Sequence, residues 1–264
     1  MSNIPKELCG VDESVWCEIA AKNCDLEMLK WAKSHGAPWD EWTGAVAAAG
    51  GHLEMLKWAK SHDAPLDEKT CAYAAQHGHL HILQWARQTN VPWDEKTCVH
   101  AAMGGHIEIL KWARAHGAPW NAYTCAYAAM YGHLNTLQWA RANGAPWNAY
   151  TCAYAAFNGN LKVLQWARAN GAPWNESTCE NAISHYHLDT LQWALTHGAP
   201  WSKESILDKI NLTQGPQFRG VALVLFRQHC GIREINIAIK EFITTMYDVL
   251  PLTGPLCNLI INYC

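Results

Sequence analysis

Apolar and small residues recur along this chain with a constant spacing of 27 residues. One column of tryptophans consists of Trp31, Trp58, Trp85, Trp112, Trp139, Trp166 and Trp193. A second column, in which proline precedes every member, consists of Trp39, Leu66, Trp93, Trp120, Trp147, Trp174 and Trp201. A third column consists of Cys17, Gly44, Cys71, Cys98, Cys125, Cys152 and Cys179. The pattern predicts seven tandem copies of one structural unit over residues 12–201.

Each unit reads as two short helices, as residues 147–171 illustrate. Asn148 is a favourable N-cap for the first helix, which then runs through Ala155 and Ala156 to a stop at Gly159. The N-cap column also holds Asp40, Asp67, Asp94, Asn121, Asn175 and Ser202. The glycine stop recurs as Gly51, Gly78, Gly105 and Gly132. The first helix therefore has a defined start and end in most units.

The second helix carries apolar residues at Leu161, Leu164 and Trp166 and ends at Gly171. The residue that terminates this second helix is, in the seven units, Gly36, Asp63, Asn90, Gly117, Gly144, Gly171 and Gly198. Glycine, asparagine and aspartate tolerate the left-handed backbone that follows a helix end. A basic column lies in the last turn, where it suits the helix dipole: Lys33, Lys60, Arg87, Arg114, Arg141 and Arg168.

A single pair of such helices cannot bury its own apolar face, but stacked pairs can. The sequence therefore predicts an all-α repeat solenoid of about seven to eight helix-turn-helix units, with the tryptophan column of the second helices as its buried spine. Residues 1–11 are expected to be a loose N-terminal lead-in. Residues 202–232 read as a degenerate eighth repeat, and residues 233–264 as a helical C-terminal cap or a docking tail.

The segments TCAYAA, GHL and LQWARANGAPWN resemble the ankyrin repeat. Thr151, Ala155–Ala156, Gly132–His133–Leu134 and Gly144–Ala145 stand in the ankyrin order. Three departures recur. Cys-Ala-Tyr replaces the usual Pro-Leu-His, tryptophan replaces a leucine of the second helix, and the unit is shorter than the usual ~33 residues, chiefly in the finger loop. Such short, tryptophan-rich units are similar to those of large DNA viruses of amoebae.

This resemblance implies a non-enzymatic scaffold that binds another protein on the face of the first helices. Variable positions that share one face of a helix are the expected contacts: Met103, Tyr123, Tyr127, Met130, Tyr131, Tyr150, Tyr154 and Phe157. For Tyr73, Tyr127 and Tyr154 the alternative is packing between neighbouring repeats.

No catalytic, cofactor or metal site is expected. The sequence has no Gly-rich phosphate loop, nucleophile elbow or paired carboxylates. The histidine column His52, His79, His106, His133 and His187 is interpreted as structural, with side chains that bond to nearby backbone, and the cluster HGHLH at 77–81 lacks accompanying metal-ligand motifs.

Charge and composition argue against nucleic acid and membranes as partners. The net charge of −3 and acidic residues beside the basic column argue against nucleic acid, and no apolar run is long enough for a membrane span. No small-molecule substrate is expected. The eleven cysteines, in a chain without a secretory leader pattern, predict reduced thiols and an intracellular, cytoplasmic location, or the host cytoplasm for a viral source.

An alternative function rests on the last residues of the chain. The segment LPLTGPLCNLIINYC at 250–264 faintly resembles an F-box-like docking helix, which would make the protein a substrate-recruiting adaptor of a ubiquitin ligase. Burial distinguishes the two interpretations, because a cap would bury Leu256, Leu259 and Ile260, whereas a docking motif would expose them.

Overall fold

A computed structural model of the chain describes residues 5–202, 204–205 and 208–209. Within these residues the fold is all-helical, with two short 3₁₀ turns followed by seven pairs of α-helices. The first helices of the pairs are α1 Trp16–Lys22, α3 Thr43–Ala49, α5 Glu68–Gln76, α7 Glu95–Met103, α9 Ala122–Met130, α11 Ala149–Phe157 and α13 Ser177–Ser184. The second helices are α2 Leu26–Ser34, α4 Leu53–Ser61, α6 Leu80–Gln88, α8 Ile107–Ala115, α10 Leu134–Ala142, α12 Leu161–Ala169 and α14 Leu188–Thr196. The predicted all-α repeat solenoid is confirmed for this part of the chain.

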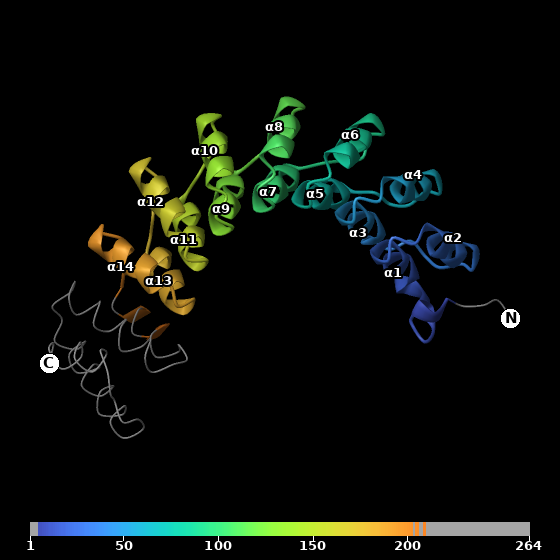
Figure 1. The fold of residues 1–264 in the computed structure, drawn as a ribbon, viewed down its shortest axis with the longest axis horizontal. Coiled ribbons are helices and arrows are strands. Elements are labelled where there is room, and N and C mark those ends of the chain that lie inside the picture. The colour runs from blue at the N-terminus through green and yellow to red at the C-terminus, as the bar shows by residue number, and fades with distance from the viewer. Residues whose placement is uncertain (1–4, 203, 206–207, 210–264) are drawn as a thin grey trace, which may run out of the picture. The chain divides into compact units, whose positions relative to one another are not determined.

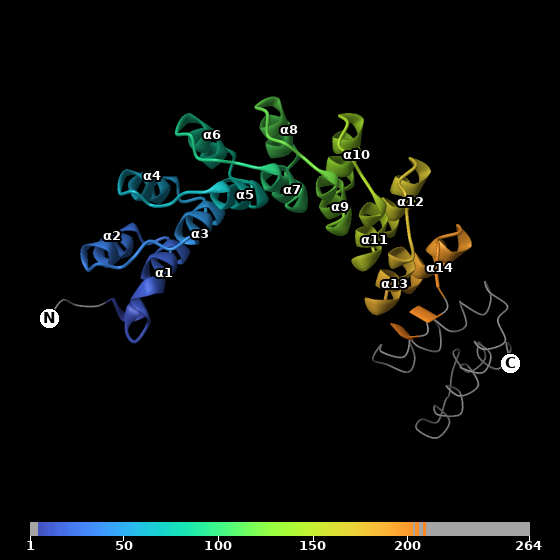
Figure 2. The same cartoon turned by 180° about the vertical axis from the view of Figure 1, so that it is seen from behind.

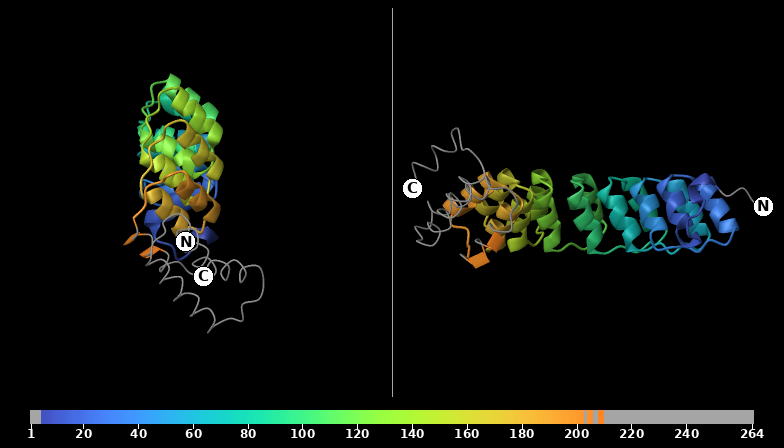
Figure 3. Two further views of the ribbon diagram at one scale, coloured as in Figure 1. Left: turned by 90° about the vertical axis from the view of Figure 1, so that its left-hand side faces the viewer. Right: turned by 90° about the horizontal axis from the view of Figure 1, so that it is seen from below.

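The chain divides into two compact units, residues 1–147 and residues 148–264. In the first unit, α1, α3, α5, α7 and α9 pack side by side as an inner row, and the second helices α2 to α10 form an outer row (Figures 1 and 2). Figure 3 shows the helices of this unit, blue to green, standing next to one another. In the second unit, α11 packs against α13 and each carries its own second helix, α12 or α14.

The first helices can pack closely because their inner faces carry only small side chains. In α9, Thr124, Cys125, Ala128 and Ala129 are fully buried, and the other first helices repeat this pattern with few changes. Small side chains let neighbouring backbones approach each other, so within each unit a repeat covers the apolar face of the next.

The large core residue of each second helix is leucine, so the expectation of a buried tryptophan spine is wrong. The fully buried leucines are Leu29, Leu56, Leu83, Leu110, Leu137, Leu164 and Leu191. Each tryptophan of the column is only half-buried. Two residues along a helix correspond to a rotation of about 200°, so Trp112 cannot share the inward face of Leu110.

The tryptophans instead build a half-exposed cluster at the ends of the second helices. The ring of Trp93 lies 6.0 Å from that of Trp112, edge to face, and the guanidinium of Arg87 stands 4.3 Å above Trp93. The ring of Trp112 stacks on His116 at 4.2 Å. Corresponding contacts recur in other repeats of each unit, so the columns serve to join the end of one pair to the start of the next.

The predicted helix starts are confirmed for α5, α7, α9 and α11. The side chains of Asp67, Asp94, Asn121 and Asn148 each accept a hydrogen bond from the amide two residues on, at 2.9–3.0 Å. Asp40 and Ser202 each accept a bond from the amide three residues on. The exceptions are α3, which begins at Thr43 behind Trp42, and α13, which begins at Ser177 behind Glu176, and neither N-cap residue makes a side-chain cap.

The predicted left-handed helix ends are confirmed as well. All seven residues of this column have positive φ, including Asp63 at 59° and Asn90 at 56°. Every glycine of the first-helix stop column also has positive φ, from 67° to 87°. The substitutions within the column thus follow from the backbone conformation that each must adopt.

The described residues before α1 pack against this helix. The turns Lys6–Leu8 and Glu13–Val15 precede α1, and Leu8 is buried at 1% exposure. The indole Nε1 of Trp16 donates to the carbonyl of Val11 at 3.0 Å. These contacts cover the free face of α1, as expected for the end of a stack.

Most of residues 202–264 lie outside the described part of the chain. The proposed eighth repeat at 202–232 and the cap or docking tail at 233–264, with Leu256, Leu259 and Ile260, therefore stay predictions. Among the described helices, none is long and apolar enough to cross a membrane.

Candidate protein-binding surface

The exposed large apolar side chains of the described residues lie on the first helices or directly beside their ends. Trp42 precedes α3 and is 39% exposed, while Tyr123 and Tyr131, at the start of α9 and directly after it, are 41% and 45% exposed. Tyr150 in α11 is 44% exposed, and Tyr186, in the turn after α13, is 46% exposed. Within the described chain, no large apolar residue of a second helix reaches this exposure.

Helix geometry explains why these side chains remain outside the core. Tyr123, Tyr127 and Met130 follow one another at three- and four-residue steps, so they share one face of α9. The opposite face holds the buried Thr124, Cys125 and Ala128. The first helices are therefore amphipathic, with small residues inward and aromatic residues outward.

In the first unit, the structure joins three of the predicted contact residues into one aromatic cluster. The ring of Tyr127 lies 6.2 Å from that of Tyr123 and 6.5 Å from that of Tyr131. Tyr127 itself is half-buried, as are Met103 and Met130. Tyr123 and Tyr131 are thus the members most accessible to a partner.

In the second unit, the predicted residues form two separate contacts. The rings of Tyr150 and Tyr154 lie 5.6 Å apart on α11. Phe157, at the end of the same helix, packs against the imidazole of His185 at 3.7 Å. Phe157 therefore contributes to packing between α11 and the end of α13 as well as to the surface.

Three rings of successive first helices form a further cluster that the predicted set of contacts omitted. Tyr73 lies 6.1 Å from Trp42, edge to face, and 5.6 Å from His100. The ammonium of Lys69 stands 4.5 Å above the Trp42 ring and pairs with Glu41 at 2.7 Å. For Tyr73 this geometry favours packing between repeats. The sequence feature that could have identified Trp42 as a contact residue is its place in the same repeat column as Tyr123 and Tyr150.

A comparison with family models finds a match in three segments of the chain. The model described as "Ankyrin repeats (many copies)" matches residues 17–59, 45–87 and 125–166. The chain contains ankyrin repeats. No curated protein sequence matches it significantly. The similarity to tryptophan-rich viral units stays a prediction.

Solved structures agree with the fold of this ankyrin-repeat protein. The crystal structure of the human ASB11 ankyrin repeat domain matches 69% of this chain and 96% of its own, with a TM-score of 0.50 and 13% sequence identity. At this identity the match supports the fold alone.

The histidine column ties neighbouring ankyrin repeats together. Nε2 of His79 donates to the carbonyl of Ala49 at 2.9 Å, and Nε2 of His133 donates to that of Met103 at 3.0 Å. His187 makes the same bond to Phe157 at 3.1 Å. The structural interpretation of the column is confirmed at these positions. The described residues contain no group of three or more potential metal ligands.

The basic column of the ankyrin repeats is engaged within the fold. Lys33, Arg114, Arg141 and Arg168 each donate a hydrogen bond to the carbonyl four residues further on. Each cation also stands over the following tryptophan, at 4.0–4.5 Å from the ring centre. These side chains are therefore held at the helix ends and do not project as a ladder of free cations.

The cysteine column of this ankyrin-repeat protein is buried, and its thiols are poor nucleophiles. Burial raises the pKa of Cys71, Cys98, Cys125 and Cys152 to about 12, although a nearby arginine acts in the opposite direction in each case. A thiol that stays protonated at neutral pH neither attacks a substrate nor binds a metal readily. The column therefore serves packing.

Proposed function

We propose that this ankyrin-repeat protein binds another protein on the outward face of its first helices and catalyses no reaction. The observation that carries the proposal is the concentration of exposed aromatic side chains on the first helices of each unit. Aromatic residues with a polar tip, such as tyrosine, are enriched in protein interfaces and supply much of their binding energy.

The proposed contact residues differ in how much surface they offer. Tyr123, Tyr131 and Tyr150 are exposed and are proposed as the main contacts. The other predicted contact residues are half-buried and are proposed to add apolar contact area beside the exposed tyrosines: Met103, Tyr127, Met130, Tyr154 and Phe157. Protein recognition is general among ankyrin repeats, whereas the face used here is our proposal.

We further propose that the protein works inside the cell, in the cytoplasm, without a cofactor, nucleic acid or small-molecule substrate. Six cysteines of the described residues are buried in the core, where a disulfide would disturb the packing. The role as a ubiquitin-ligase adaptor depends on residues 250–264, outside the described part, and stays the alternative.

The test is an affinity pull-down from a lysate of the native cell, read by mass spectrometry, with matched variants. The first variant, Tyr123→Ala with Tyr131→Ala, alters the first unit, and Tyr150→Ala alters the second. The control, Gln84→Ala with Lys162→Ala, changes exposed positions of second helices. We expect a partner retained by the wild type and the control to bind the affected aromatic variant about tenfold more weakly or worse.

Circular dichroism must show unchanged helical content in every variant. A partner that binds all variants equally would refute the proposed face. A partner lost only on deletion of residues 250–264 would favour the adaptor instead.

A further inference from the structure

The glycine position between the two helices of a repeat holds a cysteine in the first repeat. Cys24 has φ 56°, in the left-handed region otherwise occupied by Gly51, Gly78 and their equivalents. At those glycines the histidine of the next repeat lies very close: a Cβ added to Gly51 would stand 2.8 Å from Cε1 of His79. A side chain at this position must therefore contact the histidine of the next repeat.

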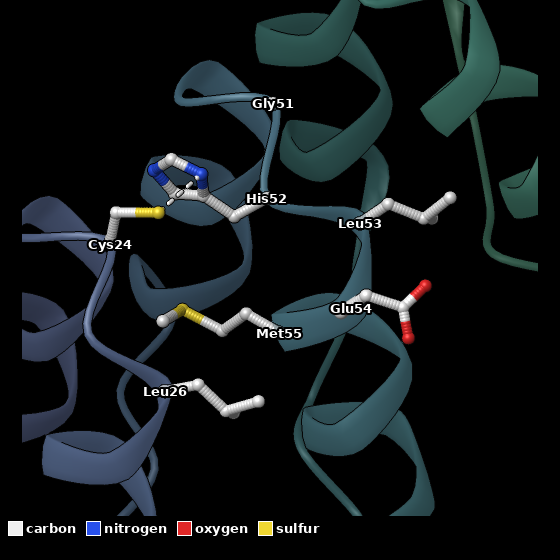
Figure 4. Close-up of a pocket in the computed structure, with 7 residues that line it drawn as sticks. All are labelled: Cys24, Leu26, Gly51, His52, Leu53, Glu54 and Met55. Carbon is white, nitrogen blue, oxygen red and sulfur yellow. Dashed lines mark hydrogen bonds between the residues drawn. The ribbon is translucent and has the colours of Figure 1, made fainter.

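In the first repeat, Cys24 makes this contact with His52. Sγ of Cys24 lies 2.9 Å from Nδ1 of His52, and the thiol and the imidazole point toward each other in Figure 4. Histidines of later repeats, such as His79, instead donate to a backbone carbonyl. The presence of a Cβ and a thiol at position 24 thus turns a structural histidine into the partner of a potential nucleophile.

The pair lies at the edge of a pocket of about 410 Å³. The apolar part of the lining comes from Leu26, Leu53 and Met55, which the α2 and α4 segments contribute, and Glu54 stands at the edge (Figure 4). Cys24 itself is exposed, so a reagent in the pocket can reach its sulfur.

The state of His52 suits the role of a base. Burial, together with the positive charge that His79 can carry, lowers the pKa of His52, so its imidazole is neutral at pH 7. A neutral imidazole at this distance can accept the thiol proton as the sulfur attacks, and so act as a general base.

We propose that Cys24 is a reactive thiol, with His52 as its base, that forms a thioether with an uncharged α,β-unsaturated carbonyl compound. The hydrocarbon chain of this compound would lie over Leu26, Leu53 and Met55. The carboxylate of Glu54 disfavours anionic reagents, and the apolar lining favours reagents with an alkyl chain.

The reaction needs no oxidant or reductant. Nδ1 of His52 takes the thiol proton, and the sulfur electron pair forms a C–S bond at the β-carbon. The C=C π pair moves toward the carbonyl as an enolate, and the α-carbon then takes up a proton. The product is a saturated carbonyl compound attached to Cys24.

The test is treatment of the full chain with a limiting amount of 2-nonenal at pH 7, followed by peptide mass mapping of each cysteine over time. Cys9 is the internal reference, because it is the other exposed cysteine of the described residues. We expect Cys24 to react about tenfold faster than Cys9 or more, and the buried column not to react in the folded protein.

His52→Asn should lower the Cys24 rate to about that of Cys9. The chain already accepts asparagine in this column at Asn160, the N-cap residue of α12, so the variant should fold. His133→Asn is the matched control, since His133 bonds to the backbone carbonyl of Met103 and does not act on His52, and it should leave the Cys24 rate unchanged. Cys24→Gly should abolish the adduct at this position.

A second reagent tests the pocket. Acrolein has the same reactive group without the alkyl chain, so the ratio of nonenal to acrolein rates should be higher at Cys24 than at Cys9. Equal ratios would overturn the proposed role of the pocket. Equal rates at Cys24 and Cys9, or an unchanged Cys24 rate in a folded His52→Asn variant, would overturn the reactive pair.

Discussion

At the scale of single residues, size and position on the helix decide which side chains carry the core. Tryptophan is abundant in the repeats, yet Leu110 and its equivalents, rather than the tryptophans, are among the fully buried large side chains. Trp112, two positions away, keeps part of its ring in solvent and packs against Trp93 and His116. Leucine is thus the residue whose truncation should leave a cavity in the interior.

We expect Leu110→Ala to lower the free energy of unfolding by about 2–5 kcal/mol, because it removes a fully buried side chain that neighbours cannot replace. The measurement is urea unfolding followed by circular dichroism. Ile107→Ala, at the half-exposed start of the same helix, is the control and should cost clearly less. Equal losses for the two variants would contradict the assignment of the core.

The residues with positive φ show how closely residue type depends on the backbone conformation. Asp63 and Asn90 stand where five other repeats have glycine, and all adopt positive φ. Cys24 and Tyr186 occupy the other glycine column with φ of 56° and 65°, although neither type favours this region. In Cys24 the unusual conformation coincides with the contact to His52, which is where we place a chemical role.

At the scale of the helix, the ends of the second helices α2, α8, α10 and α12 are each stabilised by a cation with two functions. In α8, Arg114 donates to the carbonyl of Ala118 and its guanidinium stands 4.1 Å above the ring of Trp120. The arginine thus joins the end of one pair to the loop that begins the next. A surface pair on the same helix, Lys111 with Glu108 at 2.7 Å, faces solvent and has no such role.

Replacement of Arg114 by methionine should lower the free energy of unfolding by about 1–2 kcal/mol, since a charge-assisted hydrogen bond and a cation–π contact are lost together. Lys111→Met is the matched control and should change stability by about 0.5 kcal/mol or less. Thermal and urea unfolding of the two variants give the comparison. A loss as large for Lys111→Met would show that general charge effects dominate.

At the scale of the whole molecule, the same buried cysteine recurs in several repeats, so its contributions to the pH dependence of stability add up. The buried thiols of Cys71, Cys98, Cys125 and Cys152 share one environment and one direction of pKa shift. Because the folded pKa is about 12 against an ordinary value of 9.0, the unfolded chain loses these protons first as the pH rises. The associated stability is complete below pH 9.0 and is lost progressively toward pH 12.

The free energy of unfolding should therefore fall as the pH rises from 9.0 toward 12, with up to ~1.4 kcal/mol per pH unit from each buried thiol. Urea unfolding at pH 8, 9 and 10 measures the slope. Cys98→Ala should show a shallower fall than the wild type, whereas Cys9→Ala, at an exposed position, should not. Identical slopes for all three proteins would refute the contribution of the buried column.

The sequence by itself determined the local features: the repeat length, the helix pairs, most N-caps and the left-handed ends of all seven second helices. Each of these depends on interactions within a few residues, such as Asn121 capping α9, so composition and spacing suffice to predict them. The same holds for the outward face of α9, which follows from helical periodicity alone.

Only the tertiary structure decided which side chains meet between repeats. It showed that leucine rather than tryptophan fills the core, that Tyr73 packs between Trp42 and His100, and that Cys24 contacts His52, 28 residues away. The physical reason is that burial and side-chain contact depend on how closely neighbouring helices approach and at what rotation. A column read along one chain does not contain that distance or that angle.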